Sequence, residues 1–377
     1  MHPFTRCVHA GSEPEPVTGA IFPPIFQVST FVQEAPGEHK GFDYSRARNP
    51  TRDALETALA DLEGAKHALA FASGLAAEQA IIQIFPPTSK ALVCDDVYGG
   101  TGRLFRTLFA KYGFEFHFLD MSDLALLEKE ADEKTALIWI ETPTNPTLKI
   151  IDIAAVAAIA KKVSACLVVD NTFASPIFQQ PLALGADIVI HSTTKYIGGH
   201  SDLIGGAVMT SNPELFQQLQ YVQFAAGAVP APFECFLLLR SIKTLAIRMQ
   251  QHEKNVREVV KFLCAHPKVE QVFFPGLESH PNHAIARKQM TGYSGMVSFT
   301  LRGDYEAVKR FLSRLQIIKL AESLGGVESL INHPERMTHA SVPPALREKL
   351  GIGPSLLRLS VGIEAAADLV EDLRQAF

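Results

Sequence analysis

The stretch DIVIHSTTKYIGGHSD, residues 187–202, joins a short apolar run to a cluster of polar side chains. Its residues 188–190 are apolar and β-branched, which is typical of a buried strand. Lys195 follows closely, behind Ser192 and Thr194. A lysine in a pocket at the end of a strand can lose its hydration, which lowers its pKa and frees the amine as a nucleophile towards carbonyl groups. A lysine after a strand is otherwise a solvated surface residue. Lys195 therefore indicates a reactive amine only together with other residues that suit the same site.

In the part of the chain before residue 187, short apolar runs alternate with segments in which apolar residues recur at helical spacing. This alternation predicts an α/β fold with a mostly parallel sheet. Each run ends in small or polar residues, and open parallel sheets bind ligands beyond the carboxyl ends of their strands, so we expect these ends to meet in one pocket. The predicted strands cover residues 68–71, 91–94, 136–140, 167–169 and 188–190.

The chain divides by pattern into three regions. Repeated prolines break any regular element in residues 1–50, which we expect to form an extended arm. Residues 51–235 carry the alternation of strands and helices and form the predicted large α/β domain. Residues 236–377 form a smaller predicted α+β domain, although nothing like a flexible linker marks the boundary. The patterns behind this last domain are helical over 233–264 and 305–315 and strand-like over 295–301 and 356–361.

Composition limits the class of protein. With 377 residues and 47% hydrophobic content, the chain can bury a large core. The formal net charge is -5 and there is no basic run, so nucleic acid is not an expected partner. No signal-peptide pattern and no apolar stretch of ~20 residues is present, so we expect a cytoplasmic protein without a membrane partner. The five cysteines form no CxxC pair and are expected to be reduced thiols.

Three further positions suit a phosphorylated pyridine cofactor. Asp170 ends a predicted strand, where its carboxylate can hold the protonated nitrogen of a pyridine ring and make a pyridoxal ring an electron sink. Ser73 and Gly74 open a helical run, whose N–H groups and dipole suit a phosphate. Tyr98 stands beside a glycine-rich segment, so its ring can lie over a planar cofactor. Taken singly, each position also has a structural interpretation. Asp170 could be a strand-end carboxylate bonded to the backbone, Ser73 with Gly74 a helix N-cap and tight turn, and Tyr98 a packing anchor.

Several other chemistries lack their minimal motifs. The glycines near Tyr98 do not complete G-x-G-x-x-G, because Phe105 occupies the last position. The chain has no G-x-x-x-x-G-K-[ST], no H-E-x-x-H and no G-x-S-x-G. His280 and His283 are separated by a proline, which disfavours a helical metal pair. We therefore expect neither a dehydrogenase, a nucleotide hydrolase, a metalloprotease nor a serine hydrolase, and no metal site.

Together these residues resemble the cystathionine γ-synthase and γ-lyase family of fold-type I pyridoxal-phosphate enzymes. The likeness runs from about residue 6 to the C-terminus, and its most specific part is the lysine motif at residues 187–202. The resemblance implies the fold-type I PLP-dependent transferase fold, which is aspartate aminotransferase-like: a large, mostly parallel sheet domain and a smaller C-terminal α+β domain. The other matching stretches are 44–51, 71–75, 96–100, 141–146, 169–172, 321–326 and 358–362.

The resemblance implies pyridoxal 5'-phosphate as the cofactor and a role for each matched side chain. Lys195 would be the Schiff-base lysine and the base for the substrate's Cα proton. Asp170 would pair with the pyridine nitrogen. Tyr98 would stack on the ring and is a candidate proton donor. The residues that would hold the phosphate are Gly74, Leu75, Ser192 and Thr194.

Tyr44 and Arg46 would reach the same phosphate from a neighbouring subunit, which is why the family assembles as a homotetramer, a dimer of dimers. The arm suits this role because a segment broken by prolines can extend across an interface, and Arg46 suits forked recognition of a phosphate. Arg358 would clamp the α-carboxylate of an amino-acid substrate in the same forked geometry. Ser323 and Asn145 would assist it.

The resemblance favours γ-elimination of L-cystathionine to L-cysteine, 2-oxobutyrate and ammonia, with Glu322 meeting the distal ammonium of the substrate. β-Lyases tend to have an aromatic residue where this chain has Leu324, so β-elimination is less favoured. Methionine-cleaving relatives tend to have a cysteine where this chain has Gly100, so cleavage of methionine is also less favoured. The alternative is a cystathionine γ-synthase, which joins an O-acyl-homoserine to cysteine. A catalytically idle binding or regulatory protein is a remote alternative, because Lys195 is present.

Overall fold

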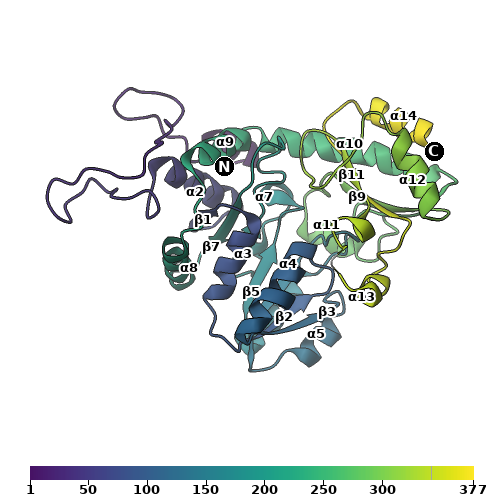
Figure 1. Cartoon of the computed structure of the whole chain (residues 1–377), viewed down its shortest axis with the longest axis horizontal. Coiled ribbons are helices and arrows are strands. Elements are labelled where there is room, and N and C mark those ends of the chain that lie inside the picture. Colours follow the sequence, from purple (N-terminus) through teal and green to yellow (C-terminus); the bar gives the residue numbers. More distant parts are fainter. Residues whose placement is uncertain (341) are drawn as a thin grey trace.

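The computed structural model describes residues 1–340 and 342–377. It contains a seven-stranded sheet with strand order β1-β7-β6-β5-β4-β2-β3 and a five-stranded sheet with order β10-β11-β12-β9-β8 (Figure 1). The strands of the first sheet are β1 (His67–Phe71), β2 (Lys90–Cys94), β3 (Glu115–Leu119), β4 (Thr135–Glu141), β5 (Cys166–Asp170), β6 (Ile188–His191) and β7 (Gly206–Thr210). Those of the second are β8 (Val269–Phe273), β9 (Met296–Leu301), β10 (Lys319–Leu320), β11 (Leu330–Asn332) and β12 (Leu356–Ser360).

The large sheet is parallel except at β7, which runs antiparallel to both β1 and β6. The prediction of a mostly parallel sheet is therefore confirmed, and each of the five predicted strands is present. The apolar runs do not predict β3 or β7. β3 is an edge strand with exposed alternate residues, so it has no continuous apolar run. β7 is fully buried, but its apolar run is only three residues long and follows two glycines, so the pattern does not single it out.

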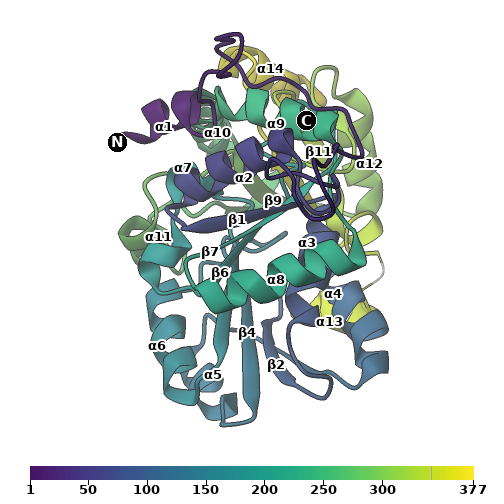
Figure 2. The ribbon, with the colours of Figure 1, turned by 90° about the vertical axis from the view of Figure 1, so that its left-hand side faces the viewer.

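Helices cover the large sheet, and several of them start at a capping side chain. The Asn49 side chain accepts from the N–H of Thr51 at the start of α2 (Pro50–Glu63), and the Ser73 side chain caps α3 (Gly74–Gln83) in the same way. Helices α2 and α8 (Pro213–Ala226) pack against β1, and α3 packs against β7 and β6 (Figure 2). The other helices beside this sheet are α4 (Gly99–Arg103), α5 (Leu124–Glu130), α6 (Ile153–Val163) and α7 (Ser175–Phe178).

The smaller sheet has a hydrophobic core of its own, separate from the core of the large sheet. Strands β10 and β11 pair in parallel and the remaining pairs are antiparallel. The predicted helix over 305–315 is α12 (Tyr305–Arg314), and the two predicted strands are β9 and β12. The division of the chain at residue 235 stays a prediction. The remaining helices here are α11 (His283–Gln289), α13 (Pro344–Lys349) and α14 (Ala366–Ala376).

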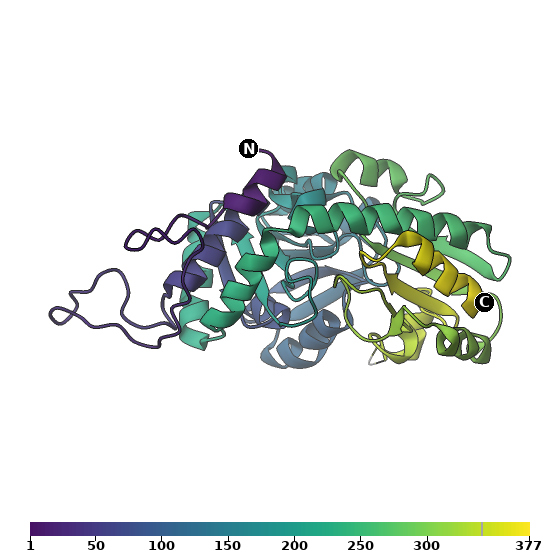
Figure 3. The ribbon, with the colours of Figure 1, turned by 90° about the horizontal axis from the view of Figure 1, so that it is seen from above.

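The helical pattern over 233–264 is confirmed, but it belongs to two helices, α9 (Pro232–Ile242) and α10 (Leu245–Ala265). Thr244 leaves the helical conformation, with φ -110° and ψ 3°. Both helices bury apolar side chains at helical spacing, so the hydrophobic period continues through the break and hides it. Helix α10 then runs alongside the smaller sheet, as the view from above shows (Figure 3).

Within the predicted N-terminal arm, residues 1–50, the segment 10–48 is extended and projects from the body of the molecule (Figure 3). Its apolar side chains at Val17, Ile21 and Val32 are 88%, 85% and 93% exposed. The prediction that prolines break every regular element here is wrong for α1 (Pro3–His9). Pro3 stands at its first position, where a helix needs no N–H group. Among the described residues, no helix is long and apolar enough to cross a membrane.

Candidate active site

A cavity of about 770 Å³ opens where β1, β4, β5 and β6 end, and residues of the smaller sheet close its other side. The strand ends therefore meet in one pocket, as expected for a parallel sheet. Every predicted site residue except Tyr44 and Arg46 lines it. These residues are Gly74, Leu75, Tyr98, Asn145, Asp170, Ser192, Thr194, Lys195, Glu322, Ser323 and Arg358.

The amine of Lys195 is fixed inside this cavity. Its Nζ donates to Ser323 Oγ at 2.7 Å, across a separation of 128 residues in the chain. Burial and, to a smaller extent, the Arg358 charge lower the pKa of Lys195 to about 8, against the opposing effect of Glu322. A substantial fraction of the amine is thus neutral near physiological pH, which is the form that attacks a carbonyl group or accepts a proton.

Asp170 stands at the end of β5 and is 9% exposed. Its Oδ1 accepts from the backbone N–H of Thr172 at 2.9 Å. Burial raises the pKa of Asp170, while the bonds from Thr172 and the nearby His191 lower it. The carboxyl group is therefore held at the floor of the cavity in a fixed orientation by its own chain.

The N-terminus of α3 forms a cradle for an anion. Ser73 Oγ accepts from the N–H of Ala76 at 3.0 Å. Within the described part of the chain, the N–H groups of Gly74 and Leu75 have no protein acceptor. A Cβ on Gly74 would lie 3.0 Å from Ser192 Cβ and 3.2 Å from its Oγ, so glycine keeps the space between them open. Two free N–H groups at a helix N-terminus suit a phosphate.

Tyr98 lies at the rim of the same cavity, between β2 and α4. Its N–H donates to Glu141 Oε2 at 2.8 Å, which fixes the backbone there. A Cβ on Gly100 would lie 2.3 Å from the Cε1 atom of the Tyr98 ring, so the ring needs glycine at that position. Burial raises the pKa of the Tyr98 phenol, which keeps its proton at neutral pH.

Arg358 on β12 is 2% exposed and extends into the cavity. Its Nη1 donates to Asn145 Oδ1 at 2.8 Å and its Nη2 to the carbonyl oxygen of Ser323 at 2.9 Å. Burial lowers the pKa of Arg358 to about 10, and Glu322 opposes the shift, so the group remains a cation at neutral pH. Its Nε is buried without a protein partner in the described residues and remains available to a ligand.

Ser323 connects the lysine and the arginine. It accepts from Lys195 through its hydroxyl and from Arg358 through its carbonyl group. Its φ is 80°, in the left-handed region that residues other than glycine rarely adopt. This backbone conformation turns both oxygens towards the two cations.

Comparison with known proteins decides the family. Residues 4–377 match the family model described as Cys/Met metabolism PLP-dependent enzyme. The chain belongs to this family. It is therefore an enzyme that uses pyridoxal phosphate, and the resemblance, the fold class and the cofactor stated above are confirmed.

Its relatives carry more than one activity in their names. The chain is 52% identical to a cystathionine beta-lyase of Coxiella burnetii over all of its own length and 97% of the relative's. It is also 52% identical to a cystathionine gamma-lyase of Dictyostelium discoideum, over 99% and 96% of the two chains. The chain also superimposes on a solved structure of cystathionine gamma synthase from Xanthomonas oryzae pv. oryzae in complex with aminoacrylate and cysteine. The TM-score is 0.97 at 44% identity, and the match covers 100% of this chain and 97% of the other.

The cavity fits the cofactor of the family on features of this chain alone. The open space at Gly74 and the two free N–H groups suit its phosphate. The amine of Lys195 has the lowered pKa that favours bonding to an aldehyde. The buried carboxyl of Asp170 suits a cationic pyridine nitrogen.

Two supporting residues were missed from the sequence. His339 donates from Nε2 to the carbonyl oxygen of Asn145 at 3.1 Å, and burial with the Arg358 charge lowers the pKa of His339 to about 4. Asp96 accepts from Thr144 Oγ1 at 2.6 Å and also from Thr147, so it braces the loop that holds Asn145. Asp96 belongs to a predicted strand-end cluster, but no signal near residue 339 indicates a contact with Asn145.

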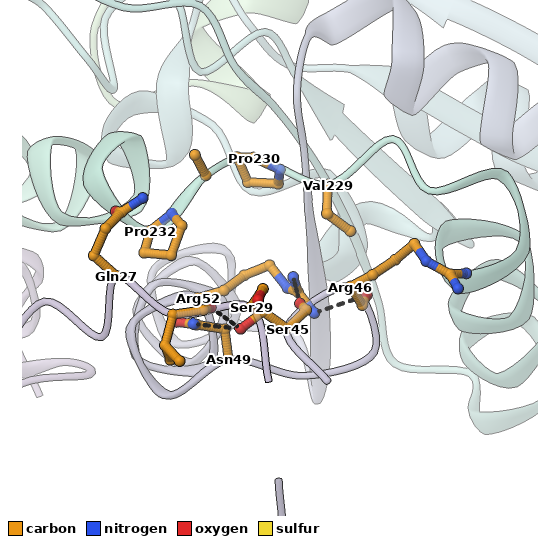
Figure 4. A pocket seen from close by; sticks show the side chains of 11 residues that line it. Gln27, Ser29, Ser45, Arg46, Asn49, Arg52, Val229, Pro230 and Pro232 are labelled. Carbon is orange, nitrogen blue, oxygen red and sulfur yellow. Dashed lines mark hydrogen bonds between the residues drawn. The ribbon is translucent and has the colours of Figure 1, made fainter. Parts of the chain in front are cut away.

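Tyr44 and Arg46 lie outside the cavity of their own chain. Arg46 lines a separate pocket of about 330 Å³ at the base of the arm, where its side chain extends away from Asn49 and Arg52 (Figure 4). Its Nη1 donates to the carbonyl oxygen of Phe224 at 2.6 Å, and its guanidinium carbon lies 4.6 Å from the centre of the Phe224 ring. Their contribution to a neighbouring subunit stays a prediction.

Proposed function

We propose that the enzyme cleaves the Cγ–S bond of L-cystathionine. With one water molecule, the products are L-cysteine, 2-oxobutyrate and ammonia. The observation that carries this proposal is the joint presence, in one cavity, of a fixed cation at Arg358, an amine of lowered pKa at Lys195 and a carboxylate at Glu322. These groups match an amino acid that has a reacting end and a second ammonium at its distal end.

Bound pyridoxal phosphate supplies an electron-withdrawing ring that stores the electron pair left when a substrate proton departs. Gly74, Leu75, Ser192 and Thr194 would hold its phosphate, and Asp170 would accept from its pyridine nitrogen. Tyr98 would cover the ring, because glycine at 100 leaves room for the tyrosine side chain.

Proton transfer falls to Lys195 and Tyr98. Near neutral pH part of the Lys195 amine is unprotonated, so its Nζ accepts the Cα proton of the substrate. Ser323 Oγ, 2.7 Å from that nitrogen, orients the amine. The Tyr98 phenol keeps its proton and is the candidate donor to the departing sulfur.

Substrate binding falls to Arg358, Asn145 and Glu322. The guanidinium, already oriented by Asn145 Oδ1 and the Ser323 carbonyl group, would bind the α-carboxylate. Glu322 lines the same cavity and would bind the distal ammonium. A substrate without that ammonium would lose this contact.

The assembly we propose is a cytoplasmic homotetramer built as a dimer of dimers, with Tyr44 and Arg46 completing the phosphate site of a neighbour. The exposed apolar side chains of the arm support it, because an arm of this kind gains stability when a second chain covers it. The five cysteines are free thiols, which fits a reducing compartment.

The second candidate is γ-replacement, in which an O-acyl-homoserine is joined to cysteine. It is considered because the chain superimposes on a cystathionine gamma synthase at a TM-score of 0.97, and nearly identical backbones can support either reaction. Both candidates need the same lysine, arginine and cofactor cradle, so the difference between them lies in how a thiol or water reaches the site.

A product assay separates the candidates. Cofactor-loaded enzyme is given cystathionine in one tube, and an O-acyl-homoserine with cysteine in another. We expect rapid release of 2-oxobutyrate from the first tube. Rapid formation of cystathionine in the second, with slow release of 2-oxobutyrate, would make the enzyme a γ-synthase. Pyruvate and homocysteine in the first tube would instead establish β-elimination, the activity named for the Coxiella relative.

A further inference from the structure

Glu78 is a buried carboxyl group in the cofactor cavity that the steps above do not use. It lies on α3, one turn after Gly74, lines the same cavity as Lys195 and is only 4% exposed. Its Oε1 accepts from the hydroxyl of Thr101 at 2.9 Å. Its Oε2 is buried and has no hydrogen-bond partner among the described residues. A buried polar atom that faces a ligand cavity without a protein partner indicates a contact that the ligand completes.

Two other buried carboxyl groups, Asp170 and Glu141, line this cavity. Each accepts from a backbone N–H group: Asp170 from Thr172 at 2.9 Å and Glu141 from Tyr98 at 2.8 Å. Among the described residues, Glu78 accepts only from a hydroxyl, which stabilises a negative charge less than an N–H group held by the backbone. A proton taken up by Asp170 and Glu78 together therefore belongs on Glu78. Burial, and then the charge of Asp170, raise the pKa of Glu78 well above its usual range.

The contact with Thr101 leaves the other oxygen of Glu78 for a ligand. A threonine hydroxyl can donate or accept, and when it donates to Oε1, that oxygen acts as the carbonyl oxygen of the acid. The proton of a neutral Glu78 is then on Oε2, the atom without a partner among the described residues. In this arrangement Glu78 presents an O–H donor to the cavity.

We propose that Glu78 is a positioning residue for the cofactor: a neutral carboxylic acid that donates from Oε2 inside the cavity and leaves Asp170 as the carboxylate for the pyridine nitrogen. The pyridine end of the ring then faces one negative charge from this pair rather than two. This inference rests on the proposed contact between Asp170 and the pyridine nitrogen, and it is independent of which bond the enzyme cleaves.

Two substitutions separate the parts of this proposal. Glu78→Gln removes the acid but keeps a neutral side chain with an N–H donor and nearly the same volume. Glu78→Leu keeps comparable bulk and removes the donor. If Glu78 acts as a neutral donor, the glutamine variant should bind the cofactor as the wild type does. The leucine variant should bind it about tenfold more weakly, the effect of one lost hydrogen bond to a buried group.

The test uses the full-length enzyme without substrate. Binding of pyridoxal phosphate to the apoenzyme is titrated by absorbance for the wild type and both variants. Infrared difference spectra of the wild type against Glu78→Gln then show whether a protonated carboxyl band is lost. The matched control is Glu56→Gln, a carboxyl group outside this cavity whose pKa burial raises to about 7. This control should leave cofactor binding unchanged.

Three results would overturn the proposal. The first is the absence of a protonated carboxyl band assigned to Glu78. The others are a Glu78→Leu variant that binds the cofactor as tightly as the wild type, and a Glu78→Gln variant that binds it as weakly as Glu78→Leu. Glu78→Met serves as a second apolar variant if the leucine variant does not fold. Because no turnover is measured, an error in the proposed γ-elimination would leave these readings unaffected.

Discussion

The cavity and the N-terminal arm both contain predicted site residues, but they differ in how those residues are held. In the cavity, Arg358 is 2% exposed and its two terminal nitrogens already have partners within the chain. In the arm, Tyr44 is 45% exposed, and Arg46 contacts its own α8 rather than a site. One set of side chains is positioned by a single folded chain, whereas the other set is proposed to complete the site of a second chain.

Replacement of the cavity lysine should have the largest effect. Lys195→Ala removes both the group that bonds the cofactor aldehyde and the base, so we expect release of 2-oxobutyrate to fall by about 10³-fold or more. The yellow absorbance of the bonded cofactor should also disappear. Lys162→Ala, at an exposed pair with Glu128, is the matched control and should remain fully active. A Lys195→Ala enzyme with a tenth of the wild-type rate would show that the cavity is not the reaction site.

The second prediction concerns the geometry of the cavity rather than its charge. Arg358→Lys keeps a cation but loses the fork that contacts Asn145 and Ser323 together. We expect the KM for cystathionine to rise by about 10²-fold, because a buried charged hydrogen-bond partner is lost. The absorbance of the bonded cofactor should not change. Arg302→Lys on the surface controls for the exchange itself, and an unchanged KM would remove Arg358 from the substrate site.

The smallest direct effect should come from the arm. Arg46→Ala removes a proposed contact to the phosphate, so cofactor binding should weaken by about tenfold, as for one charge-assisted hydrogen bond. Equilibrium titration of the apoenzyme measures this change. Arg48→Ala, which removes a partly exposed pair with Asp53 in the same arm, is the control and should bind normally.

Subunit mixing extends this arm prediction. Two variants are unfolded, mixed and refolded together. One carries Lys195→Ala, and the other carries both Tyr44→Ala and Arg46→Ala. Each mixed dimer holds one site with an intact lysine and an intact arm. At a cofactor concentration too low to load the arm variant, activity should therefore recover to about a quarter of the wild type under random pairing. Recovery no greater than the sum of the separate variants would mean that the arm does not serve a neighbour.

The sequence predicts the cavity well because short stretches at strand ends supply most of its lining. Lys195 and Asp170 each follow a recognisable apolar run, so their place beside one another follows from the order of a parallel sheet. Glu78 could not be found in this way, since it belongs to the interior of a helix and carries no strand-end signal. The contact between His339 and Asn145 depends on packing between segments 194 residues apart, which periodicity does not reveal.

The left-handed backbone at Ser323 also limits how this enzyme can acquire new substrates. A side chain branched at Cβ would be strained at that φ, and glycine would lose the hydroxyl that holds Lys195. Position 323 therefore tolerates few replacements, whereas its neighbours Glu322 and Leu324 line the cavity without that restriction. Directed evolution towards other thioethers should accumulate changes at 322 and 324 and leave the serine between them intact.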